Sequence, residues 1–204
     1  MARKLKSYEY RRLSEEEKEV VLEHRKEKGH PWHSPPHSSD GEKWYLITAA
    51  NYEHQHIMKT EERRADYQRR LLDGVEQIGG EVSAWVILPN HYHLLAKVSA
   101  IEVYGKMDGD IHRGTATEWN REDATPGRKV WFRFSDREVR SEQAFFAYFN
   151  YIHGNPVKHG YVQRADEWSC SSLHSHLDKM GAKYLRMLWR LYPTFDTGKG
   201  WDDF

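Results

Sequence analysis

The sequence feature that most restricts the fold is a pair of adjacent strand patterns. Residues 82–88 form a short apolar run, Pro89 and Asn90 suit the central positions of a tight turn, and residues 91–98 alternate in character. The pattern predicts an antiparallel hairpin. Because successive side chains of a strand point to opposite faces, the second strand has one apolar face and one mixed face.

The mixed face is the unusual part of this hairpin. The apolar face consists of Tyr92, Leu94, Ala96 and Val98. The mixed face consists of His91, His93, Leu95 and Lys97. It is too polar for an ordinary core and too apolar for free solvent, so we expect another element to cover it.

His91 and His93 point the same way in such a strand, about 7 Å apart, and two imidazoles at that spacing can bind one metal ion. An isolated His-x-His pair is more often two half-buried histidines bonded to the backbone. A second pair lies downstream, where Tyr151 and Asn155 are four residues apart and stack on one face of a helix. Two imidazoles, an amide oxygen and a phenol suit a metal-assisted tyrosine nucleophile, although Tyr151 could also be one more boundary aromatic.

Composition limits the partners that this chain can have. The 204 residues are 38% hydrophobic and 30% charged, with a formal net charge of zero, so local patches must meet any nucleic acid. Cys170 is the only cysteine, which excludes an internal disulfide and a cysteine-based zinc site. No apolar run reaches membrane-spanning length and no signal-type segment follows the start, so we expect a cytoplasmic protein without a membrane partner.

Composition also divides the chain into three segments. Residues 1–43 comprise a basic arm, a charged helix over 15–28 and a linker rich in Pro, His and Ser. Residues 44–178 carry the main strand and helix patterns, and residues 179–204 are predicted to form a terminal helix and a loose tail.

Within the main segment, a strand is predicted over 44–49 and a helix from Thr60 to Gly79. The buried stripe of this helix is predicted to consist of Tyr67, Leu71, Val75 and Ile78. Residues 101–120 favour a helix interrupted by three glycines, and a further helix is predicted to end at Asn155, before Pro156. The buried stripe of that last helix is predicted to consist of Phe145, Tyr148, Phe149 and Ile152.

An aromatic and basic segment follows residue 128. Alternation over 130–134 predicts a strand whose buried face holds Val130, Phe132 and Phe134. The opposite face would place Trp131 beside Arg133, where an indole could stack on a base and a guanidinium could hold a phosphate. A partly buried surface tryptophan is an equally supported interpretation.

With these motifs together, the chain resembles REP-associated tyrosine transposases, within the HUH single-tyrosine transposases of bacterial insertion sequences. The blocks that carry the resemblance are residues 11–14, 30–36, 88–95 (LPNHYHLL), 119–121, 151–160 (YIHGNPVKHG) and 198–202. The resemblance implies an α+β fold, a ferredoxin-like or RRM-like antiparallel sheet with packed helices, known as the HUH endonuclease fold.

The resemblance also implies roles for individual residues. His91, His93 and Asn155 match the metal ligands, Tyr151 matches the nucleophile, and Tyr92 takes the middle position of the HUH motif. Ligands of this kind suit Mg²⁺ or Mn²⁺. The predicted DNA-binding residues are Trp119, Asn120, Arg128, Lys129, Trp131, Arg133, Arg137, Arg140, Lys158 and His159.

The predicted function is that of a metal-dependent single-strand DNA endonuclease and transposase. It would cleave and rejoin DNA at REP-like hairpins through a 5′-phosphotyrosine at Tyr151, with His153, Lys158 or a metal-bound water helping to remove the phenol proton. Two alternatives are a catalytically idle DNA-hairpin-binding protein and a metal phosphodiesterase that uses water. Monomer and homodimer are both compatible with the sequence.

Overall fold

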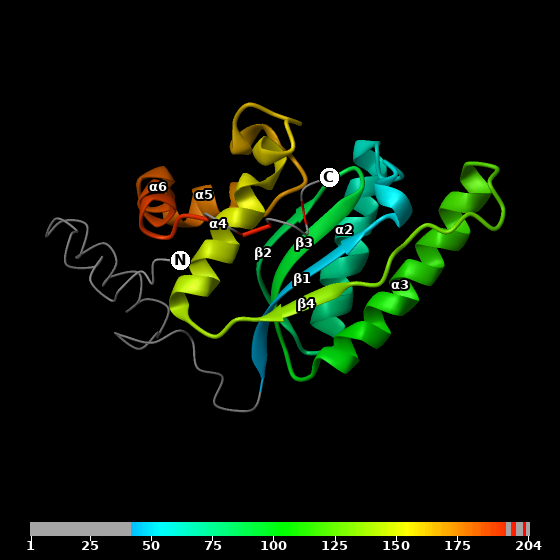
Figure 1. Cartoon of the computed structure of the whole chain (residues 1–204), viewed down its shortest axis with the longest axis horizontal. Coiled ribbons are helices and arrows are strands. Elements are labelled where there is room, and N and C mark those ends of the chain that lie inside the picture. Colours follow the sequence, from blue (N-terminus) through cyan, green and yellow to red (C-terminus); the bar gives the residue numbers. More distant parts are fainter. Residues whose placement is uncertain (1–41, 195–196, 199–201, 203–204) are drawn as a thin grey trace, which may run out of the picture.

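The computed structural model describes residues 42–194, 197, 198 and 202 (Figure 1). The predicted basic arm, the charged helix over 15–28 and the linker lie outside the described residues. The elements are β1 (Lys43–Ala50), η2 (Tyr52–His54), α2 (Glu61–Gln77), β2 (Glu81–Ile87), β3 (His91–Val98), α3 (Ile101–Glu122), β4 (Ser135–Glu138), α4 (Glu142–Lys158), η3 (Ala165–Glu167), α5 (Leu173–Met180) and α6 (Ala182–Leu191).

The four strands form one sheet in the order β2-β3-β1-β4, and every neighbouring pair is antiparallel. The chain order from β1 to β4, with α2 and α3 as the connecting helices, is the ferredoxin-like arrangement. This confirms the predicted α+β class and the predicted sheet. Pairing of β1 with β3 sets Thr48 opposite His93 and Ala50 opposite His91.

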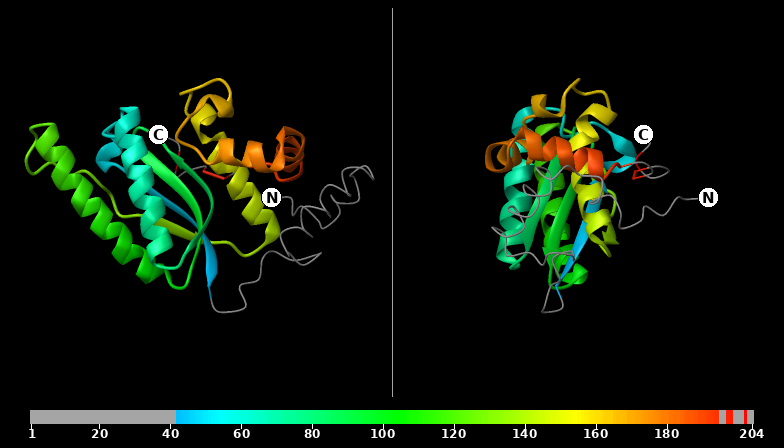
Figure 2. Two further views of the ribbon diagram at one scale, coloured as in Figure 1. Left: turned by 180° about the vertical axis from the view of Figure 1, so that it is seen from behind. Right: turned by 90° about the vertical axis from the view of Figure 1, so that its left-hand side faces the viewer.

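Helices cover both faces of the sheet (Figures 1 and 2). On one face α2 and α3 bury the predicted stripe of α2, with Tyr67 and Leu71 packed in the same core as Leu94 of β3. On the other face, α4 buries Phe149 against a core that includes Leu95. The histidine-bearing face of β3 is therefore covered by α4, as the mixed pattern predicts.

The predicted interruption of α3 is wrong, because the helix runs without a break from residue 101 to 122. Each glycine lowers helix stability by about 1 kcal/mol relative to alanine, but tertiary packing outweighs that cost. The buried residues that anchor the helix are Tyr104, Asp108, His112, Thr115 and Trp119. At Gly105 an added Cβ would lie 3.1 Å from Phe134, so the absence of a side chain permits close packing there.

Two other predicted boundaries differ from the structure. α4 continues past Pro156 to Lys158, because the N–H of His159 bonds the carbonyl of Asn155 at 3.0 Å and the last turn stays closed. Residues 130–134 do not form the predicted strand. Trp131 makes only an isolated bridge to Asn51, and β4 begins at Ser135.

The predicted terminal helix exists as α6, which packs against α4. The side-chain amide of Asn150 donates to the carbonyls of Leu188 at 2.9 Å and Tyr192 at 2.8 Å. Among the described helices, none combines the length and apolar character needed to cross a membrane.

Candidate active site

His91 and His93 begin β3 and are completely buried, with ring centroids 4.9 Å apart. Each Nδ1 atom has a partner. His91 Nδ1 lies 2.7 Å from Asn90 Oδ1, and His93 Nδ1 lies 2.7 Å from Thr48 Oγ1. With its N–H at Nδ1 donating to Asn90 Oδ1, His91 would keep a lone pair at Nε2 for a metal ion. Such partners fix ring orientation and tautomer in metal-binding histidines.

α4 brings the second predicted pair to the same place. Tyr151 and Asn155 are 3% and 0% exposed. Asn155 Oδ1 lies 3.2 Å from His91 Nε2, and the Tyr151 hydroxyl lies 3.5 Å from His93 Nε2. Two sequence motifs on different elements therefore place their polar atoms at one point between β3 and α4.

Asp202 completes this cluster, and sequence reasoning missed it. Its carboxylate is fully buried, with Oδ1 3.4 Å from His91 Nε2 and Oδ2 3.5 Å from His93 Nε2. Asn155 Nδ2 donates to Asp202 Oδ2 at 3.0 Å. The residue lies in the segment interpreted as a loose tail. The only sequence signal was the resemblance block at 198–202.

Asp202 also contacts the predicted nucleophile. The Tyr151 hydroxyl donates to Asp202 Oδ2, and Lys158 Nζ lies 2.8 Å from the same oxygen. The N–H of Asp202 bonds the carbonyl of Gly198 at 2.8 Å. Gly198 has a φ of +92°, and a Cβ there would lie 2.7 Å from the Tyr151 hydroxyl oxygen. Only glycine fits this close approach.

Burial controls the protonation of the two histidines. It lowers the pKa of His91 well below its ordinary value, and the neighbouring His93 and His159 lower it further. The pKa of His93 is likewise well below its ordinary value, mainly through burial and then through His159 and Lys158. Both imidazoles are therefore neutral at neutral pH, which is the form that binds metal.

The donor set fits a metal ion. One ligand atom from each of His91, His93 and Asp202 lies within 4.8 Å of the others. The amide oxygen of Asn155 adjoins the same point. A set of nitrogen and oxygen donors on neutral imidazoles, a carboxylate and an amide suits a divalent cation.

The candidates for proton transfer lie in different places. His153 is fully buried and its Nε2 lies 2.8 Å from Ser172 Oγ, while burial and then His176 lower its pKa well below the ordinary value. It belongs to the packing between α4 and the segment before α5. Lys158 instead lies beside the predicted nucleophile, with Nζ 5.5 Å from the centroid of the Tyr151 ring.

The two tryptophans predicted to contact DNA lie in the core. Trp119 is 2% exposed and Trp131 is 8% exposed. The Trp131 ring stacks on His112 with centroids 4.1 Å apart, and its indole N–H donates to Thr115 Oγ1 at 3.0 Å. Phe132, predicted to be buried, is 39% exposed. The burial of Trp131 favours the interpretation in which this tryptophan is structural.

The other predicted DNA-binding residues are more accessible. Asn120 and Arg128 hold their loop together, because Asn120 Nδ2 donates to the Arg128 carbonyl at 2.8 Å and Arg128 Nε donates to Asn120 Oδ1 at 3.0 Å. His159 reaches the site, with Nε2 3.4 Å from Asp202 Oδ2. The exposed basic residues along and beside β4 are Lys129, Arg133, Arg137 and Arg140.

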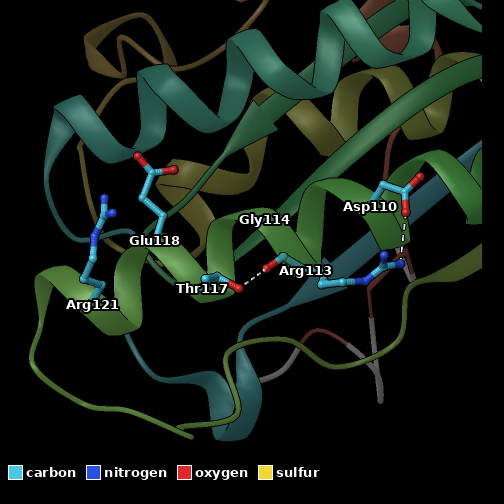
Figure 3. Close-up of a pocket in the computed structure, with 6 residues that line it drawn as sticks. All are labelled: Asp110, Arg113, Gly114, Thr117, Glu118 and Arg121. Carbon is cyan, nitrogen blue, oxygen red and sulfur yellow. Dashed lines mark hydrogen bonds and ion pairs between the residues drawn. The ribbon is translucent and has the colours of Figure 1, made fainter.

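A separate hollow lies along α3 (Figure 3). Its lining residues are Asp110, Arg113, Gly114, Thr117, Glu118 and Arg121. All six come from one helix, and Arg113 is paired with Asp110 at 2.9 Å. The hollow includes none of the residues around Tyr151, so it is not the candidate active site.

Comparison with known proteins identifies relatives of this chain. No protein-family model matches the sequence. A REP-associated tyrosine transposase of Escherichia coli K12 is 28% identical over 98 residues, which cover 46% of this chain and 54% of the relative. A Haemophilus influenzae protein whose name assigns it to the same kind of transposase is 30% identical over 105 residues, covering 46% and 59%. Over about half of its length the chain is similar to REP-associated tyrosine transposases. It spans less than two thirds of the length of either relative.

A solved structure supports the fold assignment. The structure of a REP-associated tyrosine transposase bound to a REP hairpin superposes with a TM-score of 0.54 and 19% sequence identity. The match covers 71% of this chain and 84% of the other. The two proteins share the α+β arrangement described above.

Proposed function

We propose that this chain is a metal-dependent single-strand DNA endonuclease and strand transferase that acts at hairpins. The observation that carries the proposal is the position of the Tyr151 hydroxyl, which is buried against His93 and Asp202. A neutral histidine and a carboxylate meet at this hydroxyl, and that carboxylate also contacts His91 and Asn155, a polar set that packing alone does not require. The related transposases, one of which is solved with a REP hairpin, support a hairpin as the substrate.

His91, His93 and Asn155 would hold the metal ion, and their nitrogen and oxygen donors suit Mg²⁺ or Mn²⁺. The ion supplies positive charge that polarises a phosphate oxygen and weakens its repulsion of a nucleophile. The chain supplies the orientation, because Asn90 and Thr48 fix both imidazole rings.

The Asp202 carboxylate indicates where the scissile phosphate would bind. It is an anionic pair of oxygens that contacts the Tyr151 hydroxyl, Lys158 and both histidines. The phosphate needs the same partners, so Asp202 would give way when DNA enters. Lys158 would then neutralise phosphate charge and favour the phenolate of Tyr151.

In the reaction, the phenol oxygen of Tyr151 forms a bond to phosphorus while the bond from phosphorus to the 3′ oxygen breaks. The phenol loses its proton, and the departing 3′ oxygen takes one up to become a hydroxyl. The 5′ phosphate remains joined to the tyrosine, and attack by a 3′ hydroxyl reverses the step, so strands can be rejoined without a nucleotide cofactor. A DNA substrate also agrees with the cytoplasmic location that the sequence predicts.

The decisive experiment uses a single-stranded hairpin oligonucleotide with unpaired flanks, with Mg²⁺ or Mn²⁺, followed by a denaturing gel. We expect a covalent protein–DNA adduct with the parent and none with Tyr151→Phe, which should still bind the hairpin. Tyr148→Phe is the matched control, because Tyr148 lies on the same helix and outside the cluster, and it should form the adduct normally.

The same gel separates the alternatives. A phosphodiesterase that uses water would cut the DNA without an adduct and would survive Tyr151→Phe. A hairpin-binding protein without activity would shift the DNA in a native gel and leave it intact. Either result would contradict the tyrosine mechanism.

A further inference from the structure

Three side chains form a surface cluster near one end of the sheet, which we call the aromatic platform: Tyr52, Lys129 and Phe132. The rings of Tyr52 and Phe132 have centroids 4.8 Å apart. Lys129 Nζ lies 4.3 Å from the Tyr52 centroid and 5.3 Å from the Phe132 centroid. Phe132 is 39% exposed, one of four large apolar side chains that are exposed in the described part of the chain.

Backbone hydrogen bonds hold the aromatic platform in place. The N–H of Tyr52 bonds the Val130 carbonyl at 2.8 Å, and the N–H of Phe132 bonds the Ala50 carbonyl at 2.9 Å. These bonds flank the bridge between Asn51 and Trp131 and join residues 130–132 to the chain at the end of β1. The platform is therefore attached to the rigid scaffold, which favours a defined binding geometry.

The platform lies beside the candidate active site. Ala50 of β1 pairs with His91 of β3 on one side of the strand. On the other side, next to the bridge between Asn51 and Trp131, Ala50 lies opposite Phe132. Opposed residues in antiparallel pairs project from the same face, so Phe132 leaves the sheet on the side of His91.

His54 connects the two places. Its ring centroid lies 6.3 Å from that of Phe132, and its carbonyl accepts a bond of 3.3 Å from Asn90 Nδ2. Asn90 in turn orients His91. Burial lowers the pKa of His54 and the charge of Asp202 opposes that shift, so His54 lies within electrostatic reach of the active site.

An exposed aromatic residue on its own needs no explanation. Here, however, two rings and an ammonium group gather at one point, on the face of the sheet that carries His91. Glu53 and His54, which follow Tyr52, both have a φ of 53°. Non-glycine residues in that region are strained, and such strain clusters at functional sites.

We propose that the aromatic platform binds an unpaired nucleobase of the single-stranded DNA that flanks the scissile phosphate. The base would stack on Phe132 and Tyr52, and Lys129 would contact a neighbouring phosphate. Aromatic rings beside a cation are the usual means of holding unstacked bases without sequence preference. The proposal rests on the proposed function, since it assigns the flank of that same substrate.

The test measures affinity by fluorescence anisotropy with two hairpins that have the same unpaired flanks. In one hairpin the flanking nucleotides carry bases, and in the other they are abasic, so the number of phosphates is the same. The parent should bind the hairpin with bases about tenfold more tightly, as expected for stacking of one base. Equal affinity of the parent for both hairpins would overturn the proposal.

Variants then show which residues cause the affinity difference between the two hairpins. Phe132→Ala should remove most of the tenfold difference, and Phe132→Trp should preserve it. Trp189→Ala is the matched control, because Trp189 is also 39% exposed but lies on α6, and it should leave the difference intact. A difference that persists in both Phe132→Ala and Tyr52→Ala would show that the bases bind elsewhere and would contradict the proposal.

Charge and stacking are separable in the same assay. Lys129→Gln should weaken the binding of both hairpins by the same factor and reduce the salt dependence, as loss of a phosphate contact does. A selective loss for the hairpin with bases would contradict the phosphate role of Lys129.

The two proposals fail in different ways. The affinity comparison between the two hairpins requires no cleavage, and the Tyr151 adduct gel requires no comparison of flanks, so each proposal has its own readout. A parent protein that distinguishes the two hairpins but forms no adduct would contradict the enzyme and leave the aromatic platform supported.

Discussion

Tyr92 donates a hydrogen bond of 2.7 Å to Asp108 Oδ1 on the sheet face opposite the candidate active site. The Tyr104 hydroxyl lies 3.0 Å from that of Tyr92, and all three side chains are buried. Tyr92 lies between His91 and His93 in β3. The strand that presents the two histidines is therefore anchored from behind by a buried polar group of α3.

This anchor makes stability depend on pH in a defined direction. Burial raises the pKa of Asp108 from 3.8 to about 7, whereas the hydrogen bonds from the tyrosines lower it. Between those values the folded protein holds a proton that the unfolded chain has released, so Asp108 costs stability as pH rises from about 4 to 7. Asp108→Asn removes this dependence.

We expect the stability of Asp108→Asn, relative to the parent, to rise with pH by up to about 1.4 kcal/mol per unit over that window. Denaturant unfolding of both proteins at several pH values measures it. Burial lowers the pKa of His112 to about 3 and gives an opposite slope in both proteins. A pH-independent difference would mean that Asp108 is charged in the folded state.

Metal binding should depend on both histidines. The double variant His91→Ala/His93→Ala should show no Mn²⁺ binding in a calorimetric titration, because it loses both nitrogen ligands. His176→Ala is a control outside the cluster, since His176 Nε2 bonds the Ser83 carbonyl at 2.8 Å. The same Mn²⁺ affinity in the double variant and the parent would exclude the metal site.

Asp202→Ala should raise the rate of adduct formation several-fold while leaving Mn²⁺ affinity within about twofold of the parent. The reason is that Asp202 contacts the Tyr151 hydroxyl and Lys158, the groups that the phosphate requires. Single-turnover gels and calorimetry measure the two quantities. Loss of metal affinity together with loss of activity would instead make Asp202 a required ligand.

Trp131→Ala should lower the free energy of unfolding by about 3–5 kcal/mol, the usual cost of truncating a large buried aromatic residue. It would also leave Thr115 without its indole partner. Phe132→Ala, one residue away but exposed, should stay within about 0.5 kcal/mol of the parent. Thermal and denaturant unfolding of these two variants test whether the Trp131 side chain points into the core. Equal stabilities would contradict that orientation.

Local spacing was enough to predict several parts of this molecule. The hairpin, the stripe of α2 and the shared face of Tyr151 and Asn155 depend on periodicity within one element. The contact of α4 with His91 and His93 was predicted from the resemblance. The mixed face of β3 independently predicted that another element packs on it.

The predictions from sequence were wrong where contacts between residues distant in sequence determine the structure. Trp131 faces inward because its ring stacks on His112 and its backbone pairs with Asn51, and neither contact can be read from alternation over five residues. α3 is continuous because of packing along its whole length. Asp202 reaches α4 from a segment whose composition predicts only a loose tail.

The close fit of Asp202 and Gly198 against Tyr151 has a consequence for every affinity that is measured with this chain. A phosphate would not simply add to the cluster. The Asp202 carboxylate, which is negatively charged like a phosphate, already contacts the Tyr151 hydroxyl and Lys158. Under the proposed mechanism, binding would be an exchange of one anion for another. The observed dissociation constant equals the intrinsic constant divided by the fraction of molecules in which the carboxylate has withdrawn. Weak DNA binding would therefore reflect how often Asp202 occupies the phosphate position, as well as how well the DNA fits the site.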